Sequence, residues 1–474
     1  MNEYKNLLKL DRDNPKYNYQ LGLCYLNTNV DKTLAVTYLE RSHKTEKAPS
    51  DILFHLGQAY AFAYNFDKAI ETLEEHLKKA SGKEKEKTQK LLDNCKTAKE
   101  MMLKPINVTF EIAGDAFNTE YPDYYPFVSG DETFIAFNSR RKTTKAKLEF
   151  DGYYNCDIYT SAYNGETYAT AKDVGNKLNS MFDDQVVGIS PEGDYIFIFS
   201  QAQETYGALY LVKRQGNLLG KKEQFITAVN DEKAIETSGY MSPDGQTIVF
   251  ASNRSGGQGG FDLWMVRKLP TGKWAIPQNL GPEVNTSGDE DFPSFSFDGT
   301  TLYFSSNGHA GCGGFDLFKI DWNPEDNTYS NMRNMGYPLN TPYDERTISF
   351  TQDNHHAYIS ALRKGGKGDL DIYRVTFSDI QISPAIFNIK LPTGDDAKPF
   401  INNAVIFIFS ENGDAVGEYR PNGKTGKFTI ALLPGTYNAE VRAEGYAIKT
   451  EKIKVTEFSV RTGVIEKLIM LDKK

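Results

Sequence analysis

The sequence has few of the residues on which metal, redox and membrane-spanning proteins depend. Its four cysteines, Cys24, Cys95, Cys156 and Cys312, form no C-x-x-C pair, and its six histidines form no H-E-x-x-H motif. No zinc cage, redox dithiol or zinc-protease motif is therefore present. The longest clean apolar run, "AVIFIF" at 404–409, is far shorter than the ~20 residues of a membrane-spanning helix. The sequence predicts no metal, no cofactor and no transmembrane segment.

Tryptophan is also scarce, and the 54 basic residues are outnumbered by 63 acidic ones. Three Trp accompany 28 Tyr and 29 Phe, and this aromatic content favours β structure because flat rings pack well on pleated sheets. The formal net charge is −9 and the isoelectric point is near 5.4, so we expect no binding to nucleic acid. With 474 residues and ~150 residues per domain, the chain is long enough for about three domains.

The first hundred residues have the spacing of a helical repeat. Leu, Gly and Tyr at positions 21, 22 and 25 recur at positions 56, 57 and 60. This pattern, with a small Ala69 and a bulky Leu73 in the second helix, resembles the tetratricopeptide repeat. The resemblance implies paired helices that approach each other at the glycine. We expect a helical domain over residues 1–104, with the charged segment 83–102 capping the stack.

The opening segment bears on the compartment of the protein. "MNEYKNLLKL" has no apolar signal region, which for a native start predicts a cytoplasmic protein. However, "YKNLLKLDRDNP" is typical of the second helix of an earlier repeat. We therefore expect Met1 to be a trimmed boundary, and a signal sequence to be missing from this chain.

Beyond Pro105 the spacing changes to alternating strands, and the chain repeats itself. "ASNRSGGQGGFDLW" (251–264) returns as "SSNGHAGCGGFDLF" (305–318), and an asparagine after an apolar residue marks five copies, at positions 118, 179, 230, 285 and 340. Units of ~54 residues with about four strands predict a β-propeller, here over 105–380 with five blades. Six blades are the alternative if "INVTFEIAG" belongs to an extra blade instead of closing the ring. The repeated wording resembles the TolB-like propeller repeats.

One acidic position recurs within these copies. It holds Asp157, Asp262, Asp316 and Asp371, while Ala208 replaces it in the second copy. Residues at the same position of successive blades are spaced around a propeller, so these carboxylates would not converge on a metal ion. We expect each aspartate to accept hydrogen bonds from backbone amides of its own blade.

Three short stretches look at first like ligand-binding motifs. "GGQGGFD" at 256–262 leads into a strand, whereas a dinucleotide fingerprint leads into a helix. "NGKT" at 422–425 lacks the first glycine of a phosphate loop, and "SGDEDF" at 287–292 lacks the ligand order of a calcium loop. No motif combines a nucleophile, a base and an orienting group, so we expect no catalytic residues.

The final segment, 381–474, alternates short strands with turns and predicts an antiparallel β-sandwich. Its stretch "FTIALLPGTYNAEVRAEGY" resembles the carboxypeptidase regulatory-like domain, a transthyretin-like sandwich. The resemblance implies a non-catalytic fold. The sequence as a whole therefore predicts a multidomain protein, with a helical repeat, then a propeller, then a sandwich.

Basic residues gather in one loop of the first propeller copy, where the third and fourth copies have glycines. The loop "SRRKTTKAKLEFDGYYN" contains Arg140, Arg141, Lys142, Lys145 and Lys147. Because the rest of the propeller is acidic, this cluster is the sequence's best candidate for a surface that docks on an anionic partner.

The order of the three domains resembles the PorE-like envelope proteins of the type IX secretion apparatus, which continue into an OmpA-like domain. This sequence ends at "LIMLDKK", before such a domain. The resemblance implies a periplasmic, outer-membrane-associated scaffold with protein partners, indirectly associated with peptidoglycan, that links secretion or gliding components to the envelope. The alternative is an enzyme or carbohydrate-binding protein whose site lies in the propeller channel.

Overall fold

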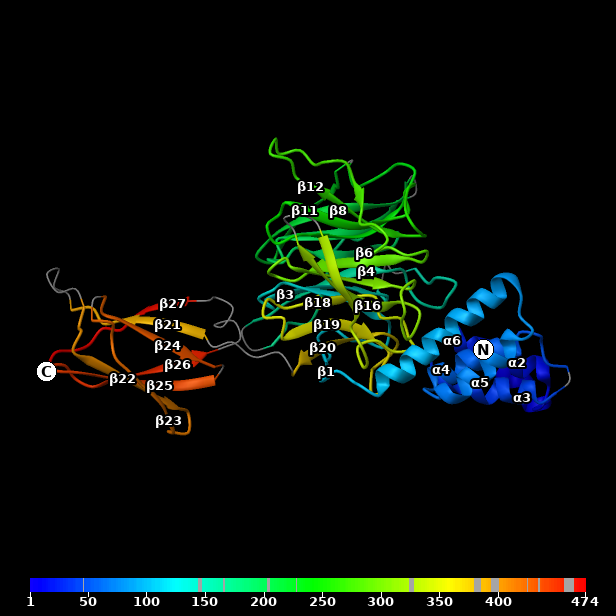
Figure 1. Cartoon of the computed structure of the whole chain (residues 1–474), viewed down its shortest axis with the longest axis horizontal. Helices are drawn as coiled ribbons and strands as arrows, with labels where there is room; N and C mark the ends of the chain where they lie inside the picture. The colour runs from blue at the N-terminus through cyan, green and yellow to red at the C-terminus, as the bar shows by residue number, and fades with distance from the viewer. Residues whose placement is uncertain are drawn as a thin grey trace. The chain divides into compact units, whose positions relative to one another are not determined.

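The computed structural model describes residues 1–474 apart from 46, 144–146, 165–166, 203–204, 227, 324–327, 379–384, 394–399, 424, 434 and 456–463. These described residues form two compact units, Met1–Phe377 and Ser378–Lys474 (Figure 1). The predicted boundary at residue 104 lies inside the first unit, so the division into three domains stays a prediction.

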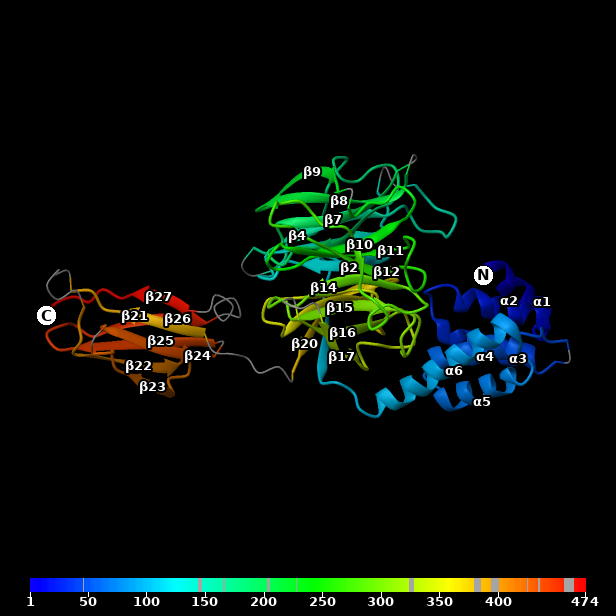
Figure 2. The ribbon, with the colours of Figure 1, turned by 45° about the horizontal axis from the view of Figure 1, so that its top comes forward.

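The first unit begins with a helical region. Its elements are α1 (Asn2–Leu10), α2 (Pro15–Leu26), η1 (Lys32–Leu34), α3 (Ala35–His43), α4 (Ile52–Phe62), α5 (Phe66–Leu77) and α6 (Gly82–Met102). The side chains of Asn14 and Asn65 cap α2 and α5 by accepting a backbone N–H of the first turn. Successive helices pack on each other, as Figure 2 shows for α5 and α6.

Two glycines set the spacing of the helix pairs. A Cβ atom added to Gly22 in α2 would lie 2.6 Å from Leu39 of α3, and one added to Gly57 in α4 would lie 2.6 Å from Leu73 of α5. Both leucines are fully buried. The repeated Leu-Gly pattern of the sequence therefore corresponds to the same close approach in two successive helix pairs.

After the helices, the described part of the first unit contains five four-stranded antiparallel sheets. Their strands are β1 (Val108–Ile112), β2 (Asp123–Val128), β3 (Phe134–Ser139), β4 (Asp157–Ala162), β5 (Lys172–Asp173), β6 (Asp184–Ile189), β7 (Tyr195–Ala202), β8 (Thr205–Gln215), β9 (Leu218–Gln224), β10 (Glu236–Met241), β11 (Thr247–Ser252), β12 (Asp262–Arg267), β13 (Gln278–Asn279), β14 (Glu290–Phe295), β15 (Thr301–Ser306), β16 (Asp316–Asn323), β17 (Thr328–Asn334), β18 (Ile348–Phe350), β19 (His356–Ala361) and β20 (Asp371–Phe377). Four sheets follow chain order, and the last has the order β1-β20-β19-β18.

The sheets pack on one another in a closed series. Shared hydrophobic clusters join the sheet of β2 to those of β6 and β10, the sheet of β10 to that of β14, and the sheet of β14 to that of β18. A further cluster places Tyr358 and Ile372 of the last sheet against Phe137 of the first. The predicted order, a helical region followed by a propeller-like arrangement of antiparallel sheets, is confirmed.

The segment "INVTFEIAG", for which the sequence left two interpretations, contains strand β1. This strand pairs with β20, with Phe110 opposite Val375. It therefore supplies the outer strand of the last sheet, so that both ends of the β region lie in one sheet.

The asparagine that recurs in each copy makes the same pair of contacts every time. Its side-chain oxygen accepts the backbone N–H, and its side-chain amide donates to the backbone oxygen, of one residue on the third strand of a sheet. The pairs are Asn179 with Ile158, Asn230 with Leu209, Asn285 with Leu263, Asn340 with Leu317 and Asn118 with Ile372. Asn118 differs only in that its partner belongs to the last sheet.

A buried carboxylate follows each asparagine by five or six residues. These acids are Asp123, Asp184, Glu236, Glu290 and Glu345, and each accepts the backbone N–H of the residue after the asparagine. A serine at the end of the neighbouring strand donates to the acid in three sheets, from Ser200, Ser252 and Ser306. Buried carboxylates need such donors, because an unpaired buried charge is costly.

The last sheet departs from this pattern. Ala361 occupies the position of the serine, so Glu345 lacks a hydroxyl donor there. The cation two residues later is affected too. Arg254 donates its Nε to Ser252, and Arg141 donates its Nε to Ser139, but the buried Nε of Arg363 has no partner among the described residues. Burial raises the pKa of Glu345 well above its usual value, and the charge of Asp316 adds to this effect.

The second unit contains two sheets that share one hydrophobic core. Its strands are β21 (Ala385–Lys390), β22 (Ala404–Ser410), β23 (Ala415–Tyr419), β24 (Lys427–Leu432), β25 (Gly435–Ala443), β26 (Lys449–Val455) and β27 (Val464–Leu468). Strands β24, β21 and β27 form one sheet, and β23, β22, β25 and β26 form the other. Phe428, Ile406 and Val441 are fully buried between them.

Among the helices that the structure describes, none is long and apolar enough to cross a membrane.

We predict that Ala361→Ser stabilises the first unit. The new hydroxyl would donate to Glu345 and accept from Arg363, as the serines of other sheets do, and a hydrogen bond to a charged group contributes about 1.5–3 kcal/mol. A cavity of about 470 Å³ beside Ala361 has room for the hydroxyl. The melting temperature can be followed by tryptophan fluorescence, since the three tryptophans, Trp264, Trp274 and Trp322, all lie in this unit.

Ala357→Ser is the matched control. Ala357 is fully buried on the same strand, inside a hydrophobic cluster, so its hydroxyl should find no partner and should lower the melting temperature. If Ala361→Ser were as destabilising as Ala357→Ser, the repeated serine would not have the role assigned to it.

Candidate functional site

Three of the repeated aspartates follow glycine-rich turns and accept backbone amides from them. The carboxylate of Asp262 accepts from Gln258 and Gly259, and that of Asp316 accepts from Cys312 at 2.9 Å and from Gly313 at 3.1 Å. Asp371 accepts from the amide of Lys367 at 2.6 Å. Asp157 lies at the equivalent start of β4 and is half-buried. These contacts hold each turn against its own sheet.

The surroundings of these aspartates differ in one respect. Asp262 also accepts from the side chain of Asn279, whereas both amides at Asp316 go to Oδ2, and its buried Oδ1 has no partner among the described atoms. Burial raises the pKa of Asp316 to about 7, and it also raises the pKa of Asp371. The two amide hydrogen bonds oppose the shift at Asp316 only in part.

Arg141, predicted as part of a docking surface, is engaged inside the fold. Its guanidinium donates to the fully buried Asp123 at 2.6 Å and to the backbone oxygen of Phe117 at 2.7 Å, and it lies 4.2 Å from the centre of the Tyr159 ring. Arg254 has the same role in the third sheet. Arg141 therefore joins a loop to the start of β2 and is not a free surface cation.

Arg140 braces the loop that follows. Its Nε donates to the backbone oxygen of Tyr154 at 2.7 Å, its Nη1 donates to Asp151 at 2.6 Å, and its guanidinium lies over the ring of Tyr153. An isolated bridge pairs Leu148 with Tyr154. We call the described residues between Arg140 and Asn155 the basic hairpin.

The basic hairpin presents a mixed surface at its tip. Lys142 and Lys147 are exposed, Leu148 is 62% exposed, and Phe150 is fully exposed. Lys145 lies outside the described residues. A large ring held in water on a braced loop is unfavourable for the isolated chain, because burying apolar surface is worth about 25 cal/mol per Å². Such a tip is typical of a surface that another molecule covers.

Asp369, in the loop between β19 and β20, ties the basic hairpin to the helical region. One of its carboxylate oxygens accepts from the hydroxyl of Tyr153, and the other accepts from the side-chain amide of Asn29 at 2.8 Å. Asn29 lies in the turn between α2 and η1. The buried carboxylate thus connects the first sheet, the last sheet and the helices.

Further contacts fix the helices on the sheets. The side chain of Asn94 in α6 donates to the backbone oxygen of Gly313 at 2.6 Å, and the rings of Phe62 and Tyr343 lie 5.0 Å apart. The thiol of Cys312 lies in the helical hydrophobic cluster, 3.2 Å from the sulfur of Met101. Burial raises the pKa of this thiol, so it is a packing group and not a reactive thiolate.

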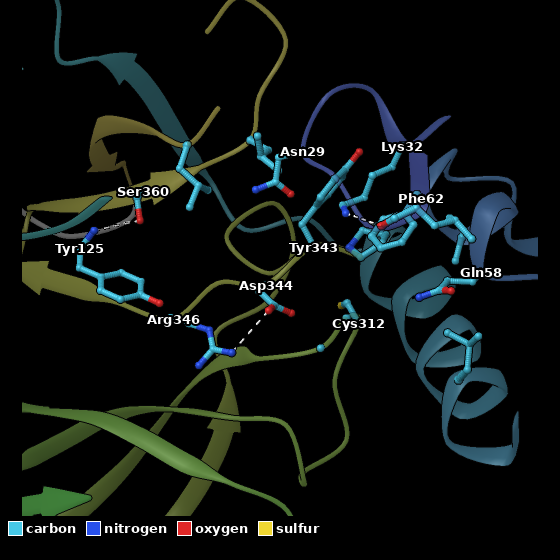
Figure 3. Close-up of a pocket in the computed structure, with 18 residues that line it drawn as sticks. Asn29, Lys32, Gln58, Phe62, Tyr125, Cys312, Tyr343, Asp344, Arg346 and Ser360 are labelled. Atoms are coloured by element: carbon cyan, nitrogen blue, oxygen red, sulfur yellow. Dashed lines mark hydrogen bonds and ion pairs between the residues drawn. The ribbon is translucent and has the colours of Figure 1, made fainter. Parts of the chain in front are cut away.

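A cavity of about 400 Å³ lies within this contact region. Figure 3 shows Lys32, Gln58 and Phe62 on its helical side, and Tyr125, Asp344 and Arg346 on its sheet side. Burial lowers the pKa of Lys32, against the charges of Asp344 and Asp369. Burial also raises the pKa of Tyr125 to about 12, an effect that the charge of Arg346 opposes.

The sequence pointed to the basic hairpin and to the aspartate turns, but not to this cavity. Lys32, Tyr125 and Arg346 are far apart in the chain, and no motif connects them. The acids that follow the repeated asparagines were also missed, although they recur at nearly the same spacing and could have been found by aligning the five copies. Among the described residues, no group of three or more His, Cys, Asp or Glu side chains could hold a metal ion.

Comparisons with known proteins add only distant likenesses. No family model and no curated protein matches the chain. Among solved structures, TolB from Acinetobacter baumannii is 15% identical with a TM-score of 0.33, over 55% of this chain and 56% of that one. The chain thus spans about half the length of that TolB. β-1,2-Mannobiose phosphorylase from Listeria innocua is 11% identical with a TM-score of 0.36, over 58% and 93%.

A third similar structure is the α-L-arabinofuranosidase PaAbf62A from Podospora anserina, which is 10% identical with a TM-score of 0.34, over 57% of this chain and 97% of that one. At such low similarity these structures carry no argument about activity. The function has to be argued from the residues of this chain.

We predict that Asp316→Asn gains stability relative to the natural chain as pH rises. From about pH 4 to 7 the folded chain holds a proton that the unfolded chain has released, so the contribution of Asp316 to the free energy of unfolding falls as pH rises through about 7. Asparagine keeps the acceptor for both amides and has no proton to lose. The advantage of the variant should grow by about 2.7 kcal/mol between pH 5 and pH 8, because the change ends near pH 7.

Thermal unfolding at both pH values measures this difference. Asp262→Asn, at the same position in the preceding sheet, is the control. Both carboxylate oxygens of Asp262 already accept N–H groups, so the new side-chain NH2 would face a donor, and the variant should be destabilised at both pH values. A gap between Asp316→Asn and the natural chain that stayed constant with pH would contradict the assignment.

Proposed function

We propose that this protein is a non-enzymatic scaffold that binds other proteins in the periplasm and links outer-membrane secretion or gliding components to the cell envelope. The observation that carries the proposal is the basic hairpin, a braced loop that carries two exposed lysines, an exposed leucine and an exposed phenylalanine. The rest of the chain also supports the proposal, because its three parts resemble domains that bind other molecules. In this proposal the helix pairs are tetratricopeptide repeats, the five sheets are propeller blades, and the second unit is a transthyretin-like sandwich.

The hairpin is built to keep its tip in place. Arg140 pairs with Asp151, the residue after Phe150, and Asp369 holds Tyr153 against the last sheet and the helices. Because these contacts order the loop before a partner arrives, binding would cost little further conformational entropy. A preordered aromatic anchor next to positive charge has the composition of an interface hot spot.

The chemistry of the tip defines the partner. Phe150 and Leu148 would enter an apolar pocket, while Lys142 and Lys147 would face acidic side chains at its rim. Arg140 and Arg141 are occupied within the fold and would act through the position of the loop. We therefore expect a protein partner with an acidic rim around an apolar pocket, located on an outer-membrane or secretion component.

We predict that Phe150→Ser with Leu148→Ser removes most of the partner binding. Loss of an aromatic hot spot costs about 2 kcal/mol or more, which is roughly thirty-fold in affinity. Lys142→Glu with Lys147→Glu should weaken binding as well, and more strongly at low salt than at high salt. The measurement is quantitative affinity purification from native envelope fractions, with identification of the recovered proteins.

A variant with equally exposed residues elsewhere serves as control. Leu218 and Lys273 are exposed and lie outside the basic hairpin, so Leu218→Ser with Lys273→Glu should recover the same partner as the natural chain. The proposal fails if no outer-membrane or secretion component is recovered, or if the hairpin variants recover it as well as the control does.

A further inference from the structure

The cavity between the helices and the sheets is lined by cations with few acceptors. The guanidinium of Arg346 lies 3.8 Å from the centre of the Phe315 ring, and its nearest carboxylate oxygen, on Asp344, is 3.6 Å away. No described residue accepts a hydrogen bond from this guanidinium. An arginine has five N–H donors in a planar fork that matches a carboxylate, so most of the binding capacity of Arg346 is unused.

Lys32 adds a second cation from the opposite wall. Its ammonium donates to the backbone oxygen of Leu26 at 2.6 Å and lies 5.3 Å from the centre of the Phe62 ring. The nearby Asp369 is already bound to Asn29 and Tyr153. The residues that line the cavity therefore include two cations, Arg346 and Lys32, and one carboxylate, Asp344, which already accepts the backbone N–H of Phe315.

The hydroxyl of Tyr125 adds a third donor. Tyr125 is held in the left-handed region, with φ of 51°, and its backbone N–H donates to Ser360. Its ring packs 4.6 Å from that of Phe292, while its hydroxyl makes no hydrogen bond with the described residues. Figure 3 shows Tyr125 and Arg346 on the same wall. Phe292, at the equivalent position of another sheet, has nearly the same φ of 49°, so this backbone conformation is a repeated structural feature, and it is the unused hydroxyl that is particular to Tyr125.

The remaining lining is apolar, and the volume suits a small molecule. Leu26, Phe62 and Leu362 contribute to the walls, and about 400 Å³ lies within the range of about 300–1,000 Å³ for small-molecule sites. Asp344 would disfavour a ligand with two negative charges, because like charges at short range repel. These features favour a ligand that has one negative charge and an apolar group.

We propose that this cavity binds a small apolar carboxylate, with the carboxylate on Arg346, Tyr125 and Lys32 and the apolar group against Phe62 and the leucines. The site is separate from the tip of the basic hairpin and does not depend on the scaffold role. A free peptide C-terminus and an aryl or alkyl acid share the required chemistry.

Calorimetric titration of the full chain tests the proposal with N-acetyl-phenylalanine, its carboxamide and 3-phenylpropionate. The acid should bind at least ten-fold more tightly than the carboxamide, since a hydrogen bond to a charged group is worth roughly one to two powers of ten in affinity. Tight binding of 3-phenylpropionate would identify an aryl or alkyl acid, and binding of N-acetyl-phenylalanine alone would identify a peptide end.

Variants locate the binding. Arg346→Gln should weaken the acid at least ten-fold, Arg346→Lys should weaken it less, and Tyr125→Phe should weaken it several-fold. Arg333→Gln is the control, because Arg333 is exposed and pairs with Asp321 outside the cavity. Melting temperatures identify any variant that fails to fold, in which case Tyr125→Phe decides. The proposal is overturned if neither acid binds, if the carboxamide binds as tightly, or if both Arg346→Gln and Tyr125→Phe bind as the natural chain does.

Discussion

In the described part of the chain, the side-chain amide of one asparagine ties each of the five sheets to the next. The asparagine forms hydrogen bonds with both backbone groups of a residue on the third strand of one sheet. The residue after it donates to an acid that lies at, or three residues before, the start of the first strand of the following sheet. Four of these ties join neighbours in the chain. The fifth, from Asn118 to Ile372, joins the first sheet to the last and so closes the series.

The buried acids and the positions of the cations follow from these ties. Each acid must find donors in a dry environment, and the sheets meet this need differently. Three acids form ion pairs, Asp123 with Arg141, Asp184 with Lys222 and Glu236 with Arg254. Glu290 instead accepts hydrogen bonds from the hydroxyls of Thr286 and Ser306. The sequence predicted Arg141 on a docking surface because a run of basic residues does not show which of its members are buried and which are exposed. The structure separates the two kinds, since Arg140 and Arg141 are braces, whereas Lys142 and Lys147 are exposed.

Sequence reasoning reached the features that repeat or alternate. The Leu-Gly pattern gave the close helix pairs, the ~54-residue period gave the succession of sheets, and the marker asparagines turned out to be the residues that join them. It did not reach features that depend on single departures or on distant contacts. Ala361 replaces the repeated serine in one sheet only. Asp369 accepts hydrogen bonds from the helical region and from the basic hairpin. The cavity is lined by Lys32, Tyr125 and Arg346, which are far apart in the chain. No local pattern connects such residues, because only the folded chain places them side by side.

Hydrogen-exchange mass spectrometry of Asn118→Ala tests most directly whether one asparagine closes the series. Removing both of its backbone hydrogen bonds should cost about 1–3 kcal/mol, which corresponds to roughly ten- to hundred-fold faster exchange where the tie is lost. The account predicts that β1, β20 and β2 lose protection together, although they come from opposite ends of the β region, while β10 to β13 keep theirs. Faster exchange confined to the residues around position 118, with β20 unchanged, would contradict it.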